Sequence, residues 1–267
     1  MILFNRKAVV NIGGREFRSP PFSVEFELQF QASGPTALEA RLWNPSDETV
    51  ERSRPSGIVG AQKFPEIRIE AGYGDEIEQV FSGEIYQAHD TWSNTDRILK
   101  LKCTDKTGLW ANAWVGRTYT DMLASQIIAA MCSAVGLRPE RIKPKTDRQY
   151  KSFAAGMFSR AMHQICVETG SAFFLSADGG IIVEDPMSKA LEIAIDVSTS
   201  GGVLTSPPEQ KGNLWKAKTL WLPALRRGSR LVMTYGNGER KEIKVVSGKS
   251  VFSSHGSAYT EVQGVAA

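Results

Sequence analysis

The segment Val24-Glu25-Phe26-Glu27-Leu28-Gln29-Phe30 alternates apolar and polar side chains with a period of two. Successive side chains of a β-strand point to opposite faces, so this period predicts a strand with one buried face. The same alternation returns in residues 38–42, 66–71 and 99–103. We therefore expect an antiparallel sheet or a small barrel within the first hundred residues.

A tight hairpin is predicted N-terminal to that segment. The apolar-rich stretches 9–12 and 15–18 are separated by Gly13-Gly14. A two-residue hairpin turn needs positive φ at its central residues, which glycine adopts without steric cost. The two stretches are therefore expected to pair as neighbouring antiparallel strands.

The period changes after Trp114. Apolar residues at spacings of three and four predict a helix that starts near Thr118 or Thr120 and stops at Gly136. A second helix is predicted over residues 153–169, and it ends at Gly170. Two short strands, 172–175 and 180–183, follow and are joined through Asp178-Gly179. These elements predict an α+β unit.

Strand signals resume in the last part of the chain, at residues 231–234, 241–246 and 259–263. We expect a mainly β protein with an inserted α+β unit, in which two barrel-like domains flank a small α/β region. The expected boundaries are 1–108 for the first barrel, 109–198 for the middle domain and 199–267 for the second barrel. The last segment is short for an independent core, so it is expected to pack on other parts of the chain or on another subunit.

Composition excludes several classes of protein. The chain has 267 residues, 42% of them hydrophobic, and a net charge of +3 from 32 basic and 29 acidic residues. This balance is typical of a folded domain and lacks the polybasic footprint of a nucleic-acid-binding protein. The longest apolar runs are about five residues, against roughly 20 for a membrane-spanning helix. We expect a soluble protein, made in a reducing bacterial cytoplasm and not inserted into membranes.

No catalytic, metal or cofactor motif is visible. Cys103, Cys132 and Cys166 are widely spaced, as are the three histidines, and neither set has metal-ligand spacing. There is no nucleophile elbow or phosphate-binding loop. Small basic clusters, such as Lys143 with Lys145, are interpreted as solvated faces or as contacts with an acidic neighbour. The chain is therefore expected to be neither an enzyme nor a cofactor-binding protein.

The stretch from Glu51 to Phe64 is predicted to be a long loop, because it contains two glycines, a proline and few apolar residues. Connections of more than about 12 residues are uncommon in compact domains and are often functional. An unremarkable surface loop is the competing interpretation. The residues of this loop expected to contact a neighbouring subunit or another protein are Arg52, Arg54, Ile58, Val59, Gln62 and Lys63.

The order of several short motifs resembles the hub proteins of phage tail baseplates, from contractile-tailed phages and related injection systems. The motifs are Asn44-Pro45-Ser46, Ala71-Gly72-Tyr73-Gly74-Asp75, Val80-Phe81-Ser82-Gly83-Glu84-Ile85, Trp114-Val115-Gly116-Arg117-Thr118, Glu168-Thr169-Gly170, Gly202-Val203-Leu204-Thr205-Ser206-Pro207-Pro208-Glu209 and Leu222-Pro223-Ala224-Leu225-Arg226-Arg227-Gly228. The likeness covers nearly the whole chain, although Pro45 stands where the family often has leucine. We also expect no C-terminal extension that would carry an enzyme or a spike.

The resemblance implies a structural virion protein without an active site. Three chains with two tube-like barrels each would form a trimeric ring that joins a six-fold tail tube to a three-fold central spike. The implied partners are the tube ring, the spike and also tape measure and baseplate wedge proteins, while DNA passes through without specific binding. Four residues of the predicted strands are expected to line an acidic channel: Glu25, Glu27, Glu66 and Glu70.

Two other functions stay open on the sequence. A monomeric β-rich module that binds carbohydrate or peptide has the same strand patterns. A cell-wall hydrolase would need catalytic groups that converge in space, and no such constellation is apparent in the sequence.

Overall fold

The computed structural model describes residues 5–31, 34–57, 63–105, 113–176, 180–186, 194–198, 203–235 and 238–266. The chain divides into two compact units. The first comprises Met1–Gln31, Thr36–Thr104 and Leu191–Ala267, and the second comprises Ala32–Pro35 and Asp105–Ala190. The two ends of the chain, predicted as separate barrels, thus belong to one unit. The three-domain division of the sequence analysis stays a prediction.

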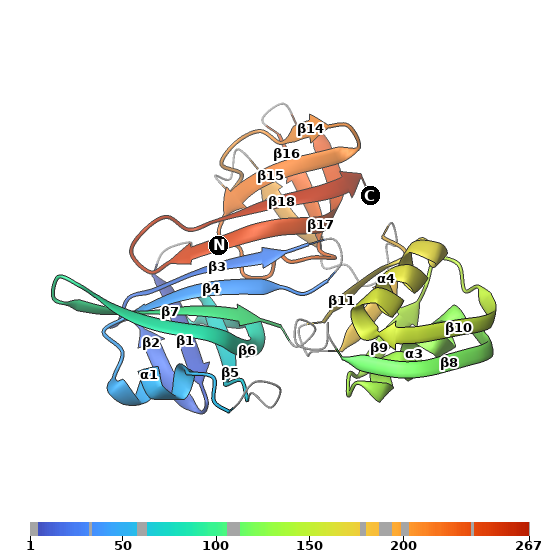
Figure 1. The fold of residues 1–267 in the computed structure, drawn as a ribbon. Helices are drawn as coiled ribbons and strands as arrows, with labels where there is room; N and C mark the ends of the chain where they lie inside the picture. The colour runs from blue at the N-terminus through green and yellow to red at the C-terminus, as the bar shows by residue number, and fades with distance from the viewer. Residues whose placement is uncertain are drawn as a thin grey trace. The chain divides into compact units, whose positions relative to one another are not determined.

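The first half of the first unit is an antiparallel sheet with the strand order β3-β4-β7-β6-β5-β1-β2 (Figure 1). The strands are β1 (Arg6–Ile12), β2 (Arg15–Ser19), β3 (Val24–Phe30), β4 (Ala37–Trp43), β5 (Glu66–Tyr73), β6 (Glu76–Ser93) and β7 (Asp96–Thr104). The predicted strands and the β1–β2 hairpin are confirmed, with φ of 54° and 85° at Gly13 and Gly14.

The longest strand of this half, β6, connects its two layers. Its first half pairs with β5 and its second half pairs with β7, and both ladders contain a register shift. Bulges of this kind increase local bending and twist, which lets one sheet curl around a core. Inward side chains from both sides of the curl, such as Val10 of β1 and Leu42 of β4, are fully buried in one cluster.

The second half of the first unit is also built from strands. They are β13 (Ala194–Ser198), β14 (Glu209–Lys211), β15 (Leu214–Leu220), β16 (Arg230–Thr234), β17 (Arg240–Ser253) and β18 (Tyr259–Ala266). The order β14-β15-β18-β17 is antiparallel, and β16 pairs with β17 and with β13. The three strands predicted in this region are confirmed, and β17 extends seven residues beyond the predicted end at Val246.

The two halves meet where β17 pairs with β3, and this junction is called the seam. Six residue pairs, from Gly248–Phe30 to Ser253–Glu25, join strands more than 200 positions apart into one continuous sheet. Beneath the seam lie the stacked rings of Phe26 and Phe252, 4.8 Å apart, and the indole of Trp221. The indole nitrogen donates a hydrogen bond to the Ser250 hydroxyl at 2.9 Å. One hydrophobic cluster therefore spans both halves, which fulfils the expectation that the short C-terminal region packs on other parts of the chain.

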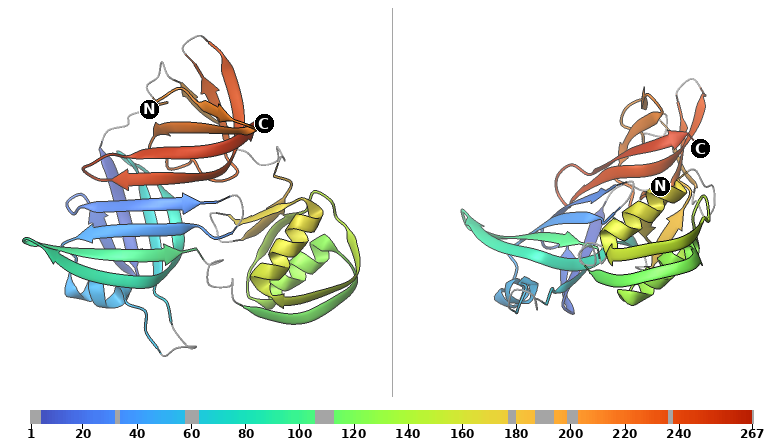
Figure 2. Two further views of the ribbon diagram at one scale, coloured as in Figure 1. Left: turned by 45° about the horizontal axis from the view of Figure 1, so that its top comes forward. Right: turned by 45° about the vertical axis from the view of Figure 1, so that its right-hand side comes forward.

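The second unit combines a two-stranded ribbon, a three-stranded sheet and two helices (Figure 2). Its elements are β8 (Trp114–Leu123), α3 (Ala124–Ala134), β9 (Pro139–Lys143), β10 (Gln149–Met157), α4 (Phe158–Thr169), β11 (Ala172–Leu175) and β12 (Ile181–Glu184). The helices pack against the inner face of the β8–β10 ribbon through one apolar cluster. The β11–β12 hairpin is confirmed as an antiparallel pair, and its predicted turn at Asp178-Gly179 lies outside the described residues.

Both predicted helix starts are wrong, whereas the glycine stops are confirmed. Thr118 and Thr120 lie inside β8, and α3 begins after Leu123, whose backbone N–H binds the Gln126 side chain. Phe153 lies in β10, so α4 begins only at Phe158. Pairing between β8 and β10 places Tyr119, Tyr150 and Phe153 in the apolar cluster of the second unit, and this long-range gain overrides a local helical spacing. Gly136 and Gly170 have left-handed φ of 78° and 66°.

Candidate assembly surface

The thiols of the chain are unsuited to nucleophilic chemistry. Cys103, Cys132 and Cys166 are free and buried. Burial disfavours the thiolate, so it raises the pKa of Cys132 and of Cys166 to about 12 and that of Cys103 further. Within the described ranges, no three His, Cys, Asp or Glu side chains are grouped closely enough to hold a metal ion.

The acidic pair Glu184-Asp185 includes one buried carboxylate. Glu184 is 4% exposed and accepts a hydrogen bond from Arg141 at 2.5 Å. A buried charge needs a partner, and the guanidinium supplies it. This pair is consistent with a structural role.

The predicted contact loop begins later than expected, because a short helix, α1 (Asp47–Ser53), occupies its first residues. Ser46 caps this helix and accepts a hydrogen bond from the Thr49 backbone at 3.2 Å. Arg52 therefore lies on α1, where it bonds Glu48 at 3.1 Å and the Gly13 carbonyl at 2.9 Å. The remaining loop is closed at its base by two backbone hydrogen bonds between Ser56 and Lys63.

Of the six predicted contact residues, Arg52, Arg54 and Lys63 are described. Ile58, Val59 and Gln62 lie outside the described residues. The exposed position of Lys63 and the partly exposed guanidinium of Arg54 leave both residues accessible to a partner. Their role in contacts with another ring or subunit stays a prediction.

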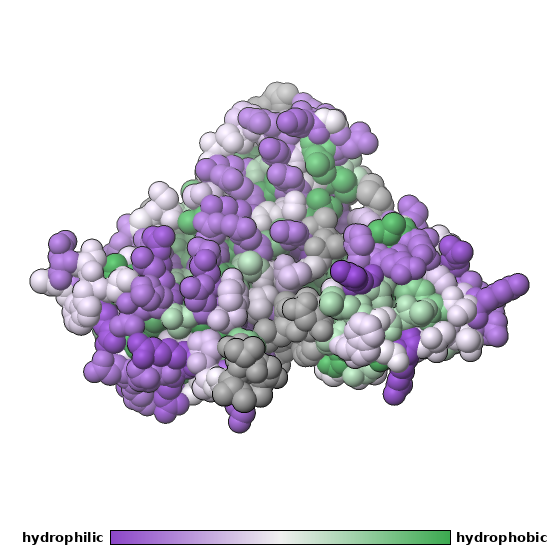
Figure 3. All heavy atoms as spheres, viewed as in Figure 1, coloured by the Kyte–Doolittle hydropathy of each residue, from purple (hydrophilic) through white to green (hydrophobic). Residues whose placement is uncertain are grey.

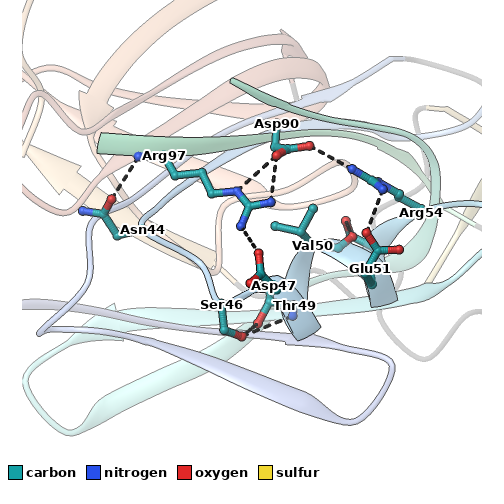
Figure 4. Close-up of polar contacts among 10 residues, drawn as sticks. Asn44, Ser46, Asp47, Thr49, Val50, Glu51, Arg54, Asp90 and Arg97 are labelled. Atoms are coloured by element: carbon teal, nitrogen blue, oxygen red, sulfur yellow. Dashed lines mark hydrogen bonds and ion pairs between the residues drawn. The ribbon is translucent and has the colours of Figure 1, made fainter. Parts of the chain in front are cut away.

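An arginine–aspartate chain fastens α1 to the β6–β7 hairpin (Figure 4). Arg54 donates to Asp90 at 3.1 Å, and Asp90 also accepts two hydrogen bonds from Arg97, at 2.9 and 3.1 Å. Arg97 in turn donates to Asp47 in the first turn of α1. The hydrogen bonds from Arg97 hold the pKa of Asp90 below its usual value, since they favour the ionised carboxylate. This chain fixes the base of the predicted contact loop.

The four predicted channel residues lie on two separate strands. Glu25 and Glu27 are on β3, whereas Glu66 and Glu70 are on β5, with β4, β7 and β6 between them in the strand order. Glu70 pairs with Arg68 of its own strand at 2.8 Å. The structure thus brings the first two together and places the other two elsewhere on the curled sheet.

The outer face of the sheet at the seam carries both signs of charge, and this surface is called the seam face. Figure 3 shows hydrophilic side chains gathered over it. Its four glutamates each lie within 4.0 Å of a basic group, in the pairs Glu25–Arg41, Glu27–Lys249, Glu39–Lys102 and Glu261–Lys218. Each of these carboxylates thus has a cation nearby, and the lining of an acidic channel by Glu25 and Glu27 stays a prediction.

Two further features of the seam face are the ionisation of Glu27 and a hollow in the surface. Burial opposes ionisation of Glu27, yet hydrogen bonds from Lys249 and Gln29 outweigh it and lower the pKa of Glu27. A hollow of about 520 Å³ on the same face is lined by side chains of β15, β18, β17 and β3, including Lys216, Lys218 and Gln263. No local pattern in the sequence indicates that β15 and β18 contribute to this face, because alternation marks a strand's faces but not its neighbours.

No family model matches the sequence, and no curated protein matches it. Solved structures do match. The 43 kDa tail protein of prophage MuSo2 from Shewanella oneidensis has a TM-score of 0.70 at 8% identity, over 98% of both chains. The tail protein from Neisseria meningitidis MC58 has a TM-score of 0.70 at 10% identity, over 98% of this chain and 97% of that one.

A third similar structure belongs to an injection machine. The Escherichia coli c3393 protein, a type VI secretion system component described as similar to the T4 tail proteins gp27 and gp5, has a TM-score of 0.68 at 11% identity. The alignment covers 97% of this chain and 76% of that one. These likenesses show that the chain has the fold of phage tail and type VI secretion proteins. They confirm, at the level of the fold, the resemblance to baseplate hub proteins.

Proposed function

We propose that this protein is a structural hub of a phage tail or related injection machine. The observation that carries the proposal is the continuous sheet across the seam, in a fold shared with tail proteins over 98% of both chains. The described residues form a β-sheet scaffold, and their cysteines are buried with raised pKa values. We propose a non-enzymatic role on this basis.

The two halves of the first unit supply the geometry of an adaptor. Each half is a mainly antiparallel β structure, and both share one core. Three copies in a closed ring would therefore present six similar β modules, which match a six-fold tail tube on one side and a three-fold spike on the other. Closed symmetry also covers sheet edges that would otherwise promote aggregation.

The seam face is proposed to line the central channel, with Glu25 and Glu27 within it. Its paired charges leave little net field, so DNA or another polyanion would pass without strong attraction. For Glu66 and Glu70, on β5, lining of the same channel stays a prediction.

The loop after α1 is proposed to contact the tube ring or a neighbouring subunit. Its base is held by the Arg54–Asp90–Arg97 chain, so a contact there would be made by a positioned segment. The spike, tape measure and wedge proteins are the further partners that this location implies, and the place of the protein would be the baseplate of the virion. Among the described residues, no helix is long and apolar enough to cross a bilayer.

The oligomeric state of the full chain tests the proposal. Native mass spectrometry should give three times the 29.3 kDa chain mass, and negative-stain images should show a ring with six-fold outline. If the free chain is a monomer, the measurement is repeated after mixing with the tube protein of the same phage. A chain that stays monomeric in both conditions and binds no tail component would overturn the proposal in favour of a carbohydrate- or peptide-binding module.

Deletion of residues 57–62 with insertion of six alternating glycine and serine residues tests the contact loop, because it removes the native side chains and keeps Arg54 and the spacing of the Ser56–Lys63 pair. Ring formation is expected to persist while tail assembly is lost. The charge reversal Lys211→Glu in the exposed β14 serves as the matched surface control. Normal assembly and infectivity of the deletion variant would remove the loop from the proposal.

A further inference from the structure

One edge of β10 pairs with no other strand of the described chain. Its nine residues, Gln149–Met157, pair with β8 alone. An unpaired edge presents a row of backbone N–H and C=O groups that can accept another strand. The edge of β10 is therefore a site where an extended segment can bind.

Three other edge strands, β2, β14 and β8, are protected in ways that β10 is not. Natural proteins protect edges with prolines, bulges, charges or very short strands. Thus β2 has three charged residues among its five and is followed by Pro20-Pro21, while β14 has three residues. The strand β8 is interrupted by positive φ at Gly116 and Asp121. In contrast, β10 contains no proline, and its single register shift lies at its end.

The chain segment that leads into β10 is basic. Residues 138–151 contain six basic and two acidic side chains, and Lys143 and Lys145 were already singled out in the sequence. Lys143 and Lys151 are exposed and have no ion-pair partner among the described residues. One of the two acids, Asp147, is engaged by the backbone and hydroxyl of Ser125 at 2.9 and 2.7 Å. A lysine on an edge strand disfavours a basic partner strand and complements an acidic one.

An exposed indole lies at the far end of the same ribbon. Trp114 is 74% exposed, and it pairs in register with Met157. A Cβ atom at Gly116 would come within 2.7 Å of its Nε1, and one at Gly156 within 3.3 Å of its Cη2. The ring therefore rests on glycines of both strands and reaches across to β10. Tryptophans held in this way are frequent energetic centres of protein interfaces.

From these observations we propose that the β10 edge binds an acidic, extended segment of a partner protein, which adds a third strand to the ribbon. Backbone hydrogen bonds along Gln149–Met157 hold the segment, Lys143 and Lys151 select its acidic side chains, and Trp114 contacts an apolar residue at one end. This site is made of residues of the second unit alone, and the proposal does not depend on the proposed hub function. A second copy of this chain fits less well, because its β10 carries Lys151 and no acidic side chain.

The probe is a fluorescein-labelled nine-residue peptide in which glutamate alternates with valine, and binding to the full chain is followed by fluorescence anisotropy. Saturable binding is expected, with a dissociation constant that rises at least tenfold between 50 and 300 mM salt. Two control peptides separate the contribution of charge from that of backbone hydrogen bonds. Lysine in place of glutamate should abolish binding, and methylation of every backbone nitrogen should abolish it at unchanged charge. Equal binding of the methylated peptide would overturn strand addition.

Amino-acid substitutions in the full chain test whether the peptide binds at the β10 edge. The double variant Lys143→Glu/Lys151→Glu and the single variant Trp114→Ala are each expected to weaken binding at least tenfold, whereas Lys211→Glu in the first unit should leave it unchanged. Circular dichroism checks that each variant is folded. Unchanged affinity in the first two variants would contradict the proposal. Tighter binding of a DNA duplex than of the peptide, lost in the lysine variant, would assign the surface to nucleic acid and would also contradict it.

Discussion

The two faces of the seam are made by the same strands and serve different purposes. The inner face places Phe26, Phe252 and Trp221 in contact, all at most 3% exposed. The outer face carries ion pairs such as Glu27–Lys249, whose side chains are about one-third exposed. Buried apolar area contributes much more free energy than solvated ion pairs do. The inner face therefore decides whether the two halves stay joined, and the outer face is free to vary for function.

The largest expected loss of stability comes from removing a large buried side chain from the inner face. Trp221→Ala removes a buried indole and its hydrogen bond to Ser250, and it should lower the free energy of unfolding by about 3–5 kcal/mol. Urea denaturation followed by circular dichroism measures this loss. Trp92→Ala is the matched control, because Trp92 is 70% exposed, and it should change stability by less than about 0.5 kcal/mol. Equal losses in the two variants would contradict a seam held by its buried face.

A smaller effect is expected from overfilling the seam. A Cβ atom at Gly248 would lie 2.6 Å from the Glu261 carbonyl oxygen and 2.7 Å from the Phe30 ring. Gly248→Ala should therefore cost about 1–3 kcal/mol. Ser247→Ala, one position away, is the control in the same denaturation experiment. A Gly248→Ala variant as stable as the parent would show that the sheet relaxes at the seam.

The ion pair of Asp90 and Arg97 is intermediate in exposure between the inner and the outer face of the seam, since the two side chains are 19% and 17% exposed. Asp90→Asn should cost about 1–2 kcal/mol at pH 7, because it weakens charge-assisted hydrogen bonds. The folded state lowers the pKa of Asp90, so its contribution is complete above the unfolded pKa and disappears as pH falls through the folded pKa.

Denaturation of the parent and of Asp90→Asn between pH 7 and pH 2 measures how the stabilisation by Asp90 depends on pH. The difference in unfolding free energy should shrink as the pH falls. Asp75→Asn is a suitable control, because Asp75 is fully exposed at its salt bridge with Lys7. A difference that grows toward acid pH would exclude the assigned role of the Asp90 carboxylate.

The smallest effect is expected on the outer face of the seam. The coupling between Glu27 and Lys249, measured by a double-mutant cycle with Glu27→Gln and Lys249→Gln, should be about 0.2–1 kcal/mol and should fall with added salt. A coupling above about 2 kcal/mol would mean that the outer face helps to hold the halves together. The conclusion that the inner face alone holds the two halves together would then be wrong.

Local patterns predicted those elements whose structure depends on local chemistry. Alternation located β3, β4, β5 and β7, and glycines located the β1–β2 turn and both helix ends. The two helix starts were mispredicted, because β8 and β10 gain their stability from each other and not from their own spacing. The candidate site was predicted in part. Arg54 was recognised, but its partner Asp90 lies 36 positions away and Arg97, which binds the same carboxylate, lies 43 positions away, and no local pattern marks them.

By itself, the amino-acid sequence determined the β-rich class, the inserted α+β region and the absence of known catalytic motifs, because these depend on composition, on side-chain period and on residues near one another. Only the tertiary structure decided that β3 pairs with β17, that Glu27 is neutralised by Lys249, and that Glu66 and Glu70 lie on another strand. The physical reason is that an alternating strand specifies which side chains turn inward, whereas its neighbour is selected by the shared core that both strands bury.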